Sequence, residues 1–171
     1  MFSVFLWVSL AMFFVLLFGM KTPKRRASTT DTFRIAVDAR PLSYGITGNS
    51  RYLFESLKHL SKIKPQWEFH LYFHKPNSLV FQELESLANV ILHKPIALPG
   101  PIWLQFYIPV QIAHDGMDLF WGTLQMLPIT KSSCPYVVNY HDLNFRSAPD
   151  TMARRNYWQH RLLSPLSLNI A

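Results

Sequence analysis

The sequence predicts an α/β protein with a doubly wound, mostly parallel sheet, preceded by an N-terminal transmembrane helix. From residue 33 onward, short apolar runs alternate with segments that have helical spacing. Strands that alternate with helices form βαβ units, whose strands are parallel. Because such crossovers are right-handed, helices then cover both faces of an open sheet. These observations predict a Rossmann-like domain over residues 33–171.

Residues 1–20 are predicted to be a membrane anchor. Residues 2–20 form an almost unbroken apolar run, FSVFLWVSLAMFFVLLFGM, which as a helix spans a hydrocarbon core of roughly 30 Å. A cleaved signal peptide is the alternative, but it begins with basic residues. Here no lysine or arginine precedes the run, and four follow it within residues 21–26. This asymmetry favours a single-pass anchor in the cytoplasmic membrane, with the domain facing the cytoplasm.

The chain is strongly basic, and a basic segment joins the anchor to the domain. Residues 21–32 are polar, basic and rich in Ser and Thr, which predicts a linker. The 171-residue chain has a formal net charge of +7, which suits anionic lipid, phosphate-bearing substrates or nucleic acid without choosing among them. The single cysteine, Cys134, cannot form an internal disulfide and favours a reducing compartment.

The first half of the domain contains three predicted strands and two predicted helices. Residues 33–37 are a short apolar run that ends at Asp38, as expected of a first strand. A helix is predicted over residues 49–63, which Pro65 ends, with five apolar residues on one stripe: Tyr52, Leu53, Leu57, Leu60 and Ile63. Aromatic content and alternation predict a second strand at residues 68–74. A short helix at 79–87 and a third strand at 89–93 are expected to follow.

The second half is predicted to add two strands and two helices. Residues 102–113 are apolar and predicted to be helical, with Pro109 as a candidate kink. Residues 118–121 and 136–140 are short apolar runs that predict strands. The last segment, residues 151–163, is predicted to be a basic and aromatic helix.

The loop after the first strand is the first candidate site, because ligands bind outside the carboxyl ends of strands in open α/β sheets. It supplies two glycines, two candidate helix caps and two arginines: Gly45 and Gly48, Thr47 and Asn49, Arg40 and Arg51. The glycines allow a tight turn and close backbone approach. The capped helix presents N–H groups to an anion, and the arginines add positive charge nearby. The alternative is an ordinary glycine turn before a capped helix.

The loop after the strand at 136–140 is the second candidate site. Its His141 can orient a hydroxyl or accept its proton, and Asp142 can fix the imidazole or bind sugar hydroxyls. The alternative is that His141 merely ends the strand. No histidine pair has zinc spacing, so no metal site is expected.

A basic and aromatic cluster near the C-terminus has three possible roles. It comprises Arg154, Arg155, Tyr157, Trp158, His160 and Arg161. Contact with nucleic acid is one possibility, but a solvated helix face or a surface near acidic lipid is favoured. No nucleic-acid partner is therefore expected.

Together the two loops resemble a known family. Residues 35–57, IAVDARPLSYGITGNSRYLFESL, resemble the opening of the family 4 retaining glycosyltransferases with the GT-B fold, which have an IDARPL-type strand and then a TGxGRY-type turn and helix. Residues 135–158, PYVVNYHDLNFRSAPDTMARRNYW, resemble that family's later "hDl" segment. The sequence departs from the family at Asn49 and Ser50, where many members have a small or apolar residue and a glycine.

The resemblance implies two facing Rossmann-like domains, the first binding acceptor and the second the nucleotide-sugar. It places the turn from Gly45 to Asn49 beside the donor phosphates and the acceptor, and His141 near the transferred sugar as the catalytic candidate. The family continues beyond Ala171 with its donor domain. The chain is thus expected to be a membrane-attached glycosyltransferase half that is inactive without that domain.

Several expectations about partners and alternatives accompany this interpretation. The expected partners are membrane lipid, a lipid-linked or saccharide acceptor and a separate nucleotide-sugar-binding domain. The nucleotide-sugar is a substrate, and no cofactor is expected. A non-catalytic membrane-bound binding or scaffold subunit, a truncated remnant and a split enzyme completed by a second polypeptide remain as alternatives.

Overall fold

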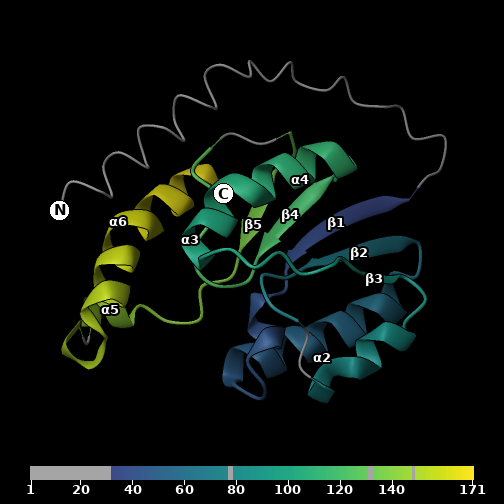
Figure 1. Cartoon of the computed structure of the whole chain (residues 1–171), viewed down its shortest axis with the longest axis horizontal. Helices are drawn as coiled ribbons and strands as arrows, with labels where there is room; N and C mark the ends of the chain where they lie inside the picture. The colour runs from purple at the N-terminus through teal and green to yellow at the C-terminus, as the bar shows by residue number, and fades with distance from the viewer. Residues whose placement is uncertain (1–31, 77–78, 131–132, 148) are drawn as a thin grey trace.

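The structure is a computed structural model, described here for residues 32–76, 79–130, 133–147 and 149–171. Its centre is a five-stranded sheet in the order β3-β2-β1-β4-β5, with every pairing parallel (Figure 1). The strands are β1 (Phe33–Asp38), β2 (Trp67–Tyr72), β3 (Val90–Leu92), β4 (Leu119–Gly122) and β5 (Tyr136–Val138). The predicted α/β class and parallel sheet are confirmed, and the strand order is consistent with a Rossmann-like fold.

Helices lie on both sides of the sheet. Figure 1 shows α2 (Gly48–Ile63) on one side and α3 (Gly100–Ile102) with α4 (Ile108–Asp115) on the other. The helix α6 (Arg154–Ile170) follows the last strand. Shorter elements are η1 (Arg40–Ser43), η2 (Leu79–Ser86), η3 (Trp103–Tyr107), α5 (Asn144–Ser147) and η4 (Pro149–Thr151).

Two apolar cores form on the two faces of the sheet because side chains alternate along each strand. Ile35 and Val37 of β1 join one core with Leu53 and Leu57 of α2, all 4% exposed or less. Ala36, between them, joins the opposite core, which includes Trp103, Ile108, Ile112 and Phe120. Burying one large aliphatic side chain contributes about 1.5–3 kcal/mol, so these contacts hold the helices on the sheet.

The predicted apolar stripe of α2 is wrong at its two ends. Leu53 and Leu57 are fully buried and Leu60 packs against the same core, but Tyr52 is 49% exposed and Ile63 is 67% exposed. A helix advances 100° per residue, so residues 53, 57 and 60 share the inner face while residues 52 and 63 lie beside it. Tyr52 is therefore available at the surface near the carboxyl edge of the sheet.

The helix predicted at 102–113 contains a π-helical turn next to Pro109. The N–H of Ile108 donates to the carbonyl of Trp103, five residues back, and η3 is this wide turn. Proline has no N–H and its ring crowds the preceding turn, so the helix widens where Pro109 enters it. The segment predicted as a helix at 79–87 consists of two short 3-10 helices on either side of a kink at Phe81, together designated η2.

The helix α6 is longer than predicted because it continues through Pro165 to Ile170. An interior proline costs a helix about 3 kcal/mol. Tertiary hydrogen bonds oppose that cost: the Tyr140 hydroxyl donates to the carbonyl of Ser164 at 2.9 Å, and the Leu127 N–H donates to Ser167 Oγ at 2.9 Å. Neither Tyr140 nor Leu127 is adjacent to Pro165 in sequence, so the continuation of α6 beyond residue 163 depends on tertiary contacts.

The expected membrane anchor, residues 2–20, lies outside the described residues. Among the residues that are described, no helix has the length and apolar character needed to cross a bilayer.

Candidate functional site

Hydrogen bonds connect the carboxyl ends of β1, β4 and β5. Thr123, just after β4, donates from its hydroxyl to the carbonyl of Asp38 at 2.6 Å. His141 Nε2 donates to the carbonyl of Thr123 at 3.1 Å. The two loops singled out in the sequence therefore open on the same edge of the sheet, beside the point where the strand order reverses between β1 and β4.

The turn after β1 is shaped by Gly45 and closed by a capping box. Gly45 has a φ of +79°, a conformation that glycine adopts without strain. Thr47 is the N-cap: its hydroxyl accepts from the N–H of Ser50 at 3.1 Å, and Ser50 Oγ accepts from the N–H of Thr47 at 2.7 Å. Asn49 is exposed in the first turn of α2, so of the two candidate caps Thr47 takes the role.

Tyr52 brings the start of α2 against His141. Their rings are 5.3 Å apart at 81°, an edge-on contact between α2 and the loop after β5. Edge-to-face pairs contribute about 0.5–1.5 kcal/mol beyond the area they bury. The contact therefore orients the imidazole from one side while Thr123 holds it from another.

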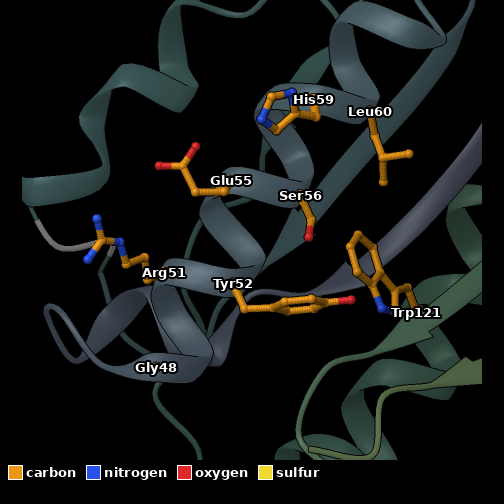
Figure 2. Close-up of a pocket in the computed structure, with 8 residues that line it drawn as sticks. All are labelled: Gly48, Arg51, Tyr52, Glu55, Ser56, His59, Leu60 and Trp121. Carbon is orange, nitrogen blue, oxygen red and sulfur yellow. The ribbon is translucent and has the colours of Figure 1, made fainter.

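An open hollow of about 600 Å³ adjoins Tyr52 (Figure 2). It is lined by Gly48, Arg51, Tyr52, Glu55, Ser56, His59, Leu60 and Trp121. Figure 2 shows the hydroxyl of Tyr52 pointing toward Trp121, with Glu55 and Arg51 on the outer side of α2. The wall is fixed because Trp121 Nε1 donates to Asn139 Oδ1 at 3.0 Å. The hollow thus offers aromatic surface and groups of both charges.

Arg40 does not supply positive charge to the loop as expected, because Asp38 neutralises it. Its Nε donates to Asp38 Oδ1 at 2.8 Å and its Nη2 to Oδ2 at 2.6 Å. Asp38 is fully buried and Arg40 is 7% exposed, with its guanidinium 5.1 Å from the centre of the Trp103 ring. A buried carboxylate requires such a partner, so the pair belongs to the interior. Arg51, which is exposed, is the arginine among the residues that line the hollow.

Asp142 is held through its backbone. Its carbonyl accepts from Gln125 Nε2 at 3.2 Å, which ties the loop after β5 to the loop after β4. Gln125 is 8% exposed and has a φ of +57°, a conformation that costs a non-glycine residue of order 1 kcal/mol or more. Such strain is common beside ligand sites.

A second polar pair lies at the end of β2. The hydroxyl of Tyr44 is 2.6 Å from His74 Nε2, and the Lys75 ammonium is 5.4 Å from the Tyr44 ring centre. Burial, with the nearby positive charges of Arg40 and Lys75, lowers the pKa of His74. Within the described part of the chain, His74 Nδ1 is buried with no hydrogen-bond partner. An unpaired lone pair costs less than an unpaired N–H, so His74 is the neutral donor to Tyr44.

A third polar cluster lies among β2, β3 and α4. His70 Nδ1 is 3.0 Å from His93 Nε2, and His70 Nε2 is 3.3 Å from Glu68 Oε2. Tyr72 stacks on His93 with ring centres 4.1 Å apart and donates to Asp115 Oδ2 at 2.6 Å. Burial lowers the pKa of both His70 and His93. In the residues described, no group of three or more His, Cys, Asp or Glu side chains is arranged to hold a metal ion.

Sequence reasoning missed three residues that build the site. Tyr52 was assigned to the buried stripe of α2, and Thr123 and Trp121 were given no role. The available signal was their position, because Trp121 and Thr123 flank the carboxyl end of β4 and Tyr52 lies in the first turns of α2.

The fold and this edge define a class of protein rather than a family. The chain is an α/β domain, consistent with a Rossmann-like fold, that has polar and aromatic groups at the switch point of its parallel sheet. No protein-family model, no curated protein and no solved structure matches the chain.

Proposed function

We propose that residues 33–171 are the N-terminal, acceptor-side half of a membrane-attached glycosyltransferase. The observation that carries the proposal is the contact of Tyr52 with His141, which joins α2, the helix that follows the glycine turn, to the loop after β5. The contact lies at the edge where open α/β sheets bind ligands, beside a hollow of about 600 Å³. The resemblance of residues 35–57 and 135–158 to family 4 glycosyltransferases selects sugar transfer among the reactions that such an edge can host.

In this proposal His141 orients a hydroxyl of the acceptor or of the transferred sugar. A neutral imidazole that donates from Nε2 to the Thr123 carbonyl carries its lone pair on Nδ1. That lone pair accepts a hydrogen bond from a hydroxyl and can take its proton. Tyr52 restricts the ring to one orientation and adds an aromatic surface for the sugar. Asp142 and Arg51 are the candidates that the sequence supplies for binding further hydroxyl or phosphate groups.

The turn after β1 has little charge to offer a leaving diphosphate. Transfer requires positive charge or fixed dipoles against the diphosphate as it departs. Asp38 neutralises Arg40, and the Thr47 hydroxyl takes the N–H of Ser50. At the start of α2, the exposed guanidinium of Arg51 and the first N–H groups of the helix remain. We therefore expect a separate nucleotide-sugar-binding domain to hold the donor, and the isolated chain to be inactive.

The same neutralised charge supports a second candidate function, a non-catalytic binding or scaffold subunit at the membrane. Such a subunit would bind a sugar-bearing acceptor at the same edge without contributing to transfer. The two candidates differ in one outcome, which is turnover in the presence of a donor domain.

The test is a transfer assay on membranes that contain the full chain. Radiolabelled UDP-glucose, UDP-N-acetylglucosamine and GDP-mannose are added with and without a separately produced donor domain. The proposal predicts no labelled acceptor from the chain alone and labelled acceptor when the donor domain is present. Robust transfer by the chain alone would contradict the half-enzyme proposal. Acceptor binding without transfer in both conditions would favour the scaffold.

A further inference from the structure

The outer face of α6 carries a row of large apolar side chains. Trp158, Leu162 and Leu166 are 54%, 62% and 45% exposed. They are four residues apart on a helix, so they lie one above another along a single stripe. Arg154 begins the same row one turn earlier. Contiguous exposed apolar surface of this kind marks an interaction site more often than a chance arrangement does.

The interior contacts of α6 fix the direction in which this stripe points. On the opposite face, Ser164 is 1% exposed and Ser167 is fully buried. The Leu127 N–H donates to Ser167 Oγ, and Tyr140 donates to the Ser164 carbonyl. These bonds determine the rotation of α6 about its own axis, so Trp158, Leu162 and Leu166 face outward as a consequence of folding.

Every charged residue of α6 is basic. The sequence of Arg154–Ile170 contains three arginines and neither aspartate nor glutamate. The Arg161 guanidinium donates from Nη1 to the Tyr157 hydroxyl at 3.0 Å, and the Tyr157 ring is 5.4 Å from that of Trp158. Arginine, tyrosine and tryptophan beside a leucine stripe is the composition of helices that lie in a membrane interface.

This combination of apolar stripe and positive charge selects among the possible occupants. Nucleic acid would satisfy the arginines but would leave the leucines against a polar backbone. A face meant for water would not place three large apolar side chains in one row. An anionic bilayer satisfies both features, because the acyl boundary accepts the apolar side chains and lipid phosphates pair with arginine.

We propose that α6 lies in the surface of an anionic lipid bilayer. Trp158, Leu162 and Leu166 enter the boundary between headgroups and acyl chains, and Arg154 and Arg161 contact lipid phosphates. This surface is independent of the proposed sugar transfer, and it is separate from the expected anchor at residues 2–20. It would hold the β5 end of the domain against the membrane.

The test measures the depth of one nitroxide on α6. The full chain carries Cys134→Ser and Leu162→Cys, labelled at the new thiol, and is reconstituted with vesicles of phosphatidylcholine alone or with phosphatidylglycerol. The matched control is Asn156→Cys, an exposed position of α6 that lies about 120° around the helix from Leu162. Collision rates with oxygen, which enters bilayers, and with a water-soluble nickel chelate are measured at both positions.

The proposal predicts a several-fold higher oxygen-to-nickel ratio at position 162 than at 156, and only in vesicles with phosphatidylglycerol. High nickel access at both positions, or failure of the chain to float with the vesicles, would overturn it. Low access of both reagents at 162 would show that protein covers the stripe, which also overturns it. Leu166→Cys serves as a second probe of the stripe. Because Asn156, Leu162 and Leu166 are all exposed, the circular dichroism spectrum of each labelled chain should match that of the parent chain.

Discussion

Two polar groups at the carboxyl edge of the sheet differ in what surrounds them. Asp38 and Arg40 are sealed, at 0% and 7% exposed, and their side chains satisfy each other through two hydrogen bonds. Tyr52 and His141 are exposed, and they are held by ring contact and by one bond to a backbone carbonyl. Both groups combine residues of the kind found in active sites. Burial and existing partners separate a group that holds the fold from a group that can meet a ligand.

The largest expected effect is the loss of the sealed carboxylate. Asp38→Asn leaves the Arg40 guanidinium buried without a counter-charge, and breaking a buried pair in this way costs about 3–5 kcal/mol. The free energy of unfolding, measured by urea titration in detergent, should fall by that amount. The matched control is Glu55→Gln, an exposed carboxylate at the hollow, which should change it by less than about 0.5 kcal/mol. If the free energy of unfolding fell by the same small amount in both variants, the buried Asp38–Arg40 pair would be no more important for stability than an exposed carboxylate.

A second test uses the pH dependence of the His70–His93 cluster. Burial lowers the pKa of both imidazoles in the folded chain, so the unfolded chain binds protons at a higher pH than the folded chain does. Stability should therefore be constant above pH 7.5 and fall as pH drops below about 6.5, the ordinary histidine pKa. Thermal midpoints from pH 7.5 to 5.0 measure this fall.

Matched variants assign the pH effect to these residues. His93→Gln removes one of the two imidazoles with a lowered pKa. It should reduce the fall of the thermal midpoint between pH 7.5 and 5.0, whatever it does to the midpoint at pH 7.5. His59→Gln, at an exposed histidine, should leave that fall unchanged. If the thermal midpoints of both variants fall with pH as steeply as that of the parent chain, the His70–His93 cluster does not control acid stability.

The smallest of these stability effects concerns the turn before α2. Thr47→Ala removes the hydroxyl that accepts from the N–H of Ser50 and should cost about 1 kcal/mol of unfolding free energy. Asn49→Ala is the control, since Asn49 is exposed and does not cap the helix, and it should be neutral within about 0.5 kcal/mol. The reverse order would mean that Asn49 caps α2 and that the turn differs from the one described.

The sequence predicted the elements of the fold better than the state of its polar groups. Apolar runs and helical spacing placed all five strands and the helix of residues 48–63 to within a few residues, because burial imposes those periods. Arg40 was expected to be available because it lies in a glycine-containing loop, and its burial depends on Trp103 and Gly100, far along the chain. The path of α6 through Pro165 likewise depends on Tyr140 and Leu127, which no local pattern reveals.

The central claim, that the open pair serves sugar transfer and not folding, is tested most directly by His141→Gln. Glutamine can place an amide N–H where the His141 Nε2 donates to the Thr123 carbonyl, and it removes the imidazole lone pair. The matched control is His114→Gln, at a histidine whose side chain is 79% exposed and which is remote from the edge in sequence and fold. In membranes supplied with a donor domain, we expect His141→Gln to lower kcat by about 100-fold or more, while the free energy of unfolding falls by no more than about 1.5 kcal/mol, the contribution of the lost Tyr52 ring contact. Unchanged kcat, or a loss of stability that matches the loss of activity, would contradict it.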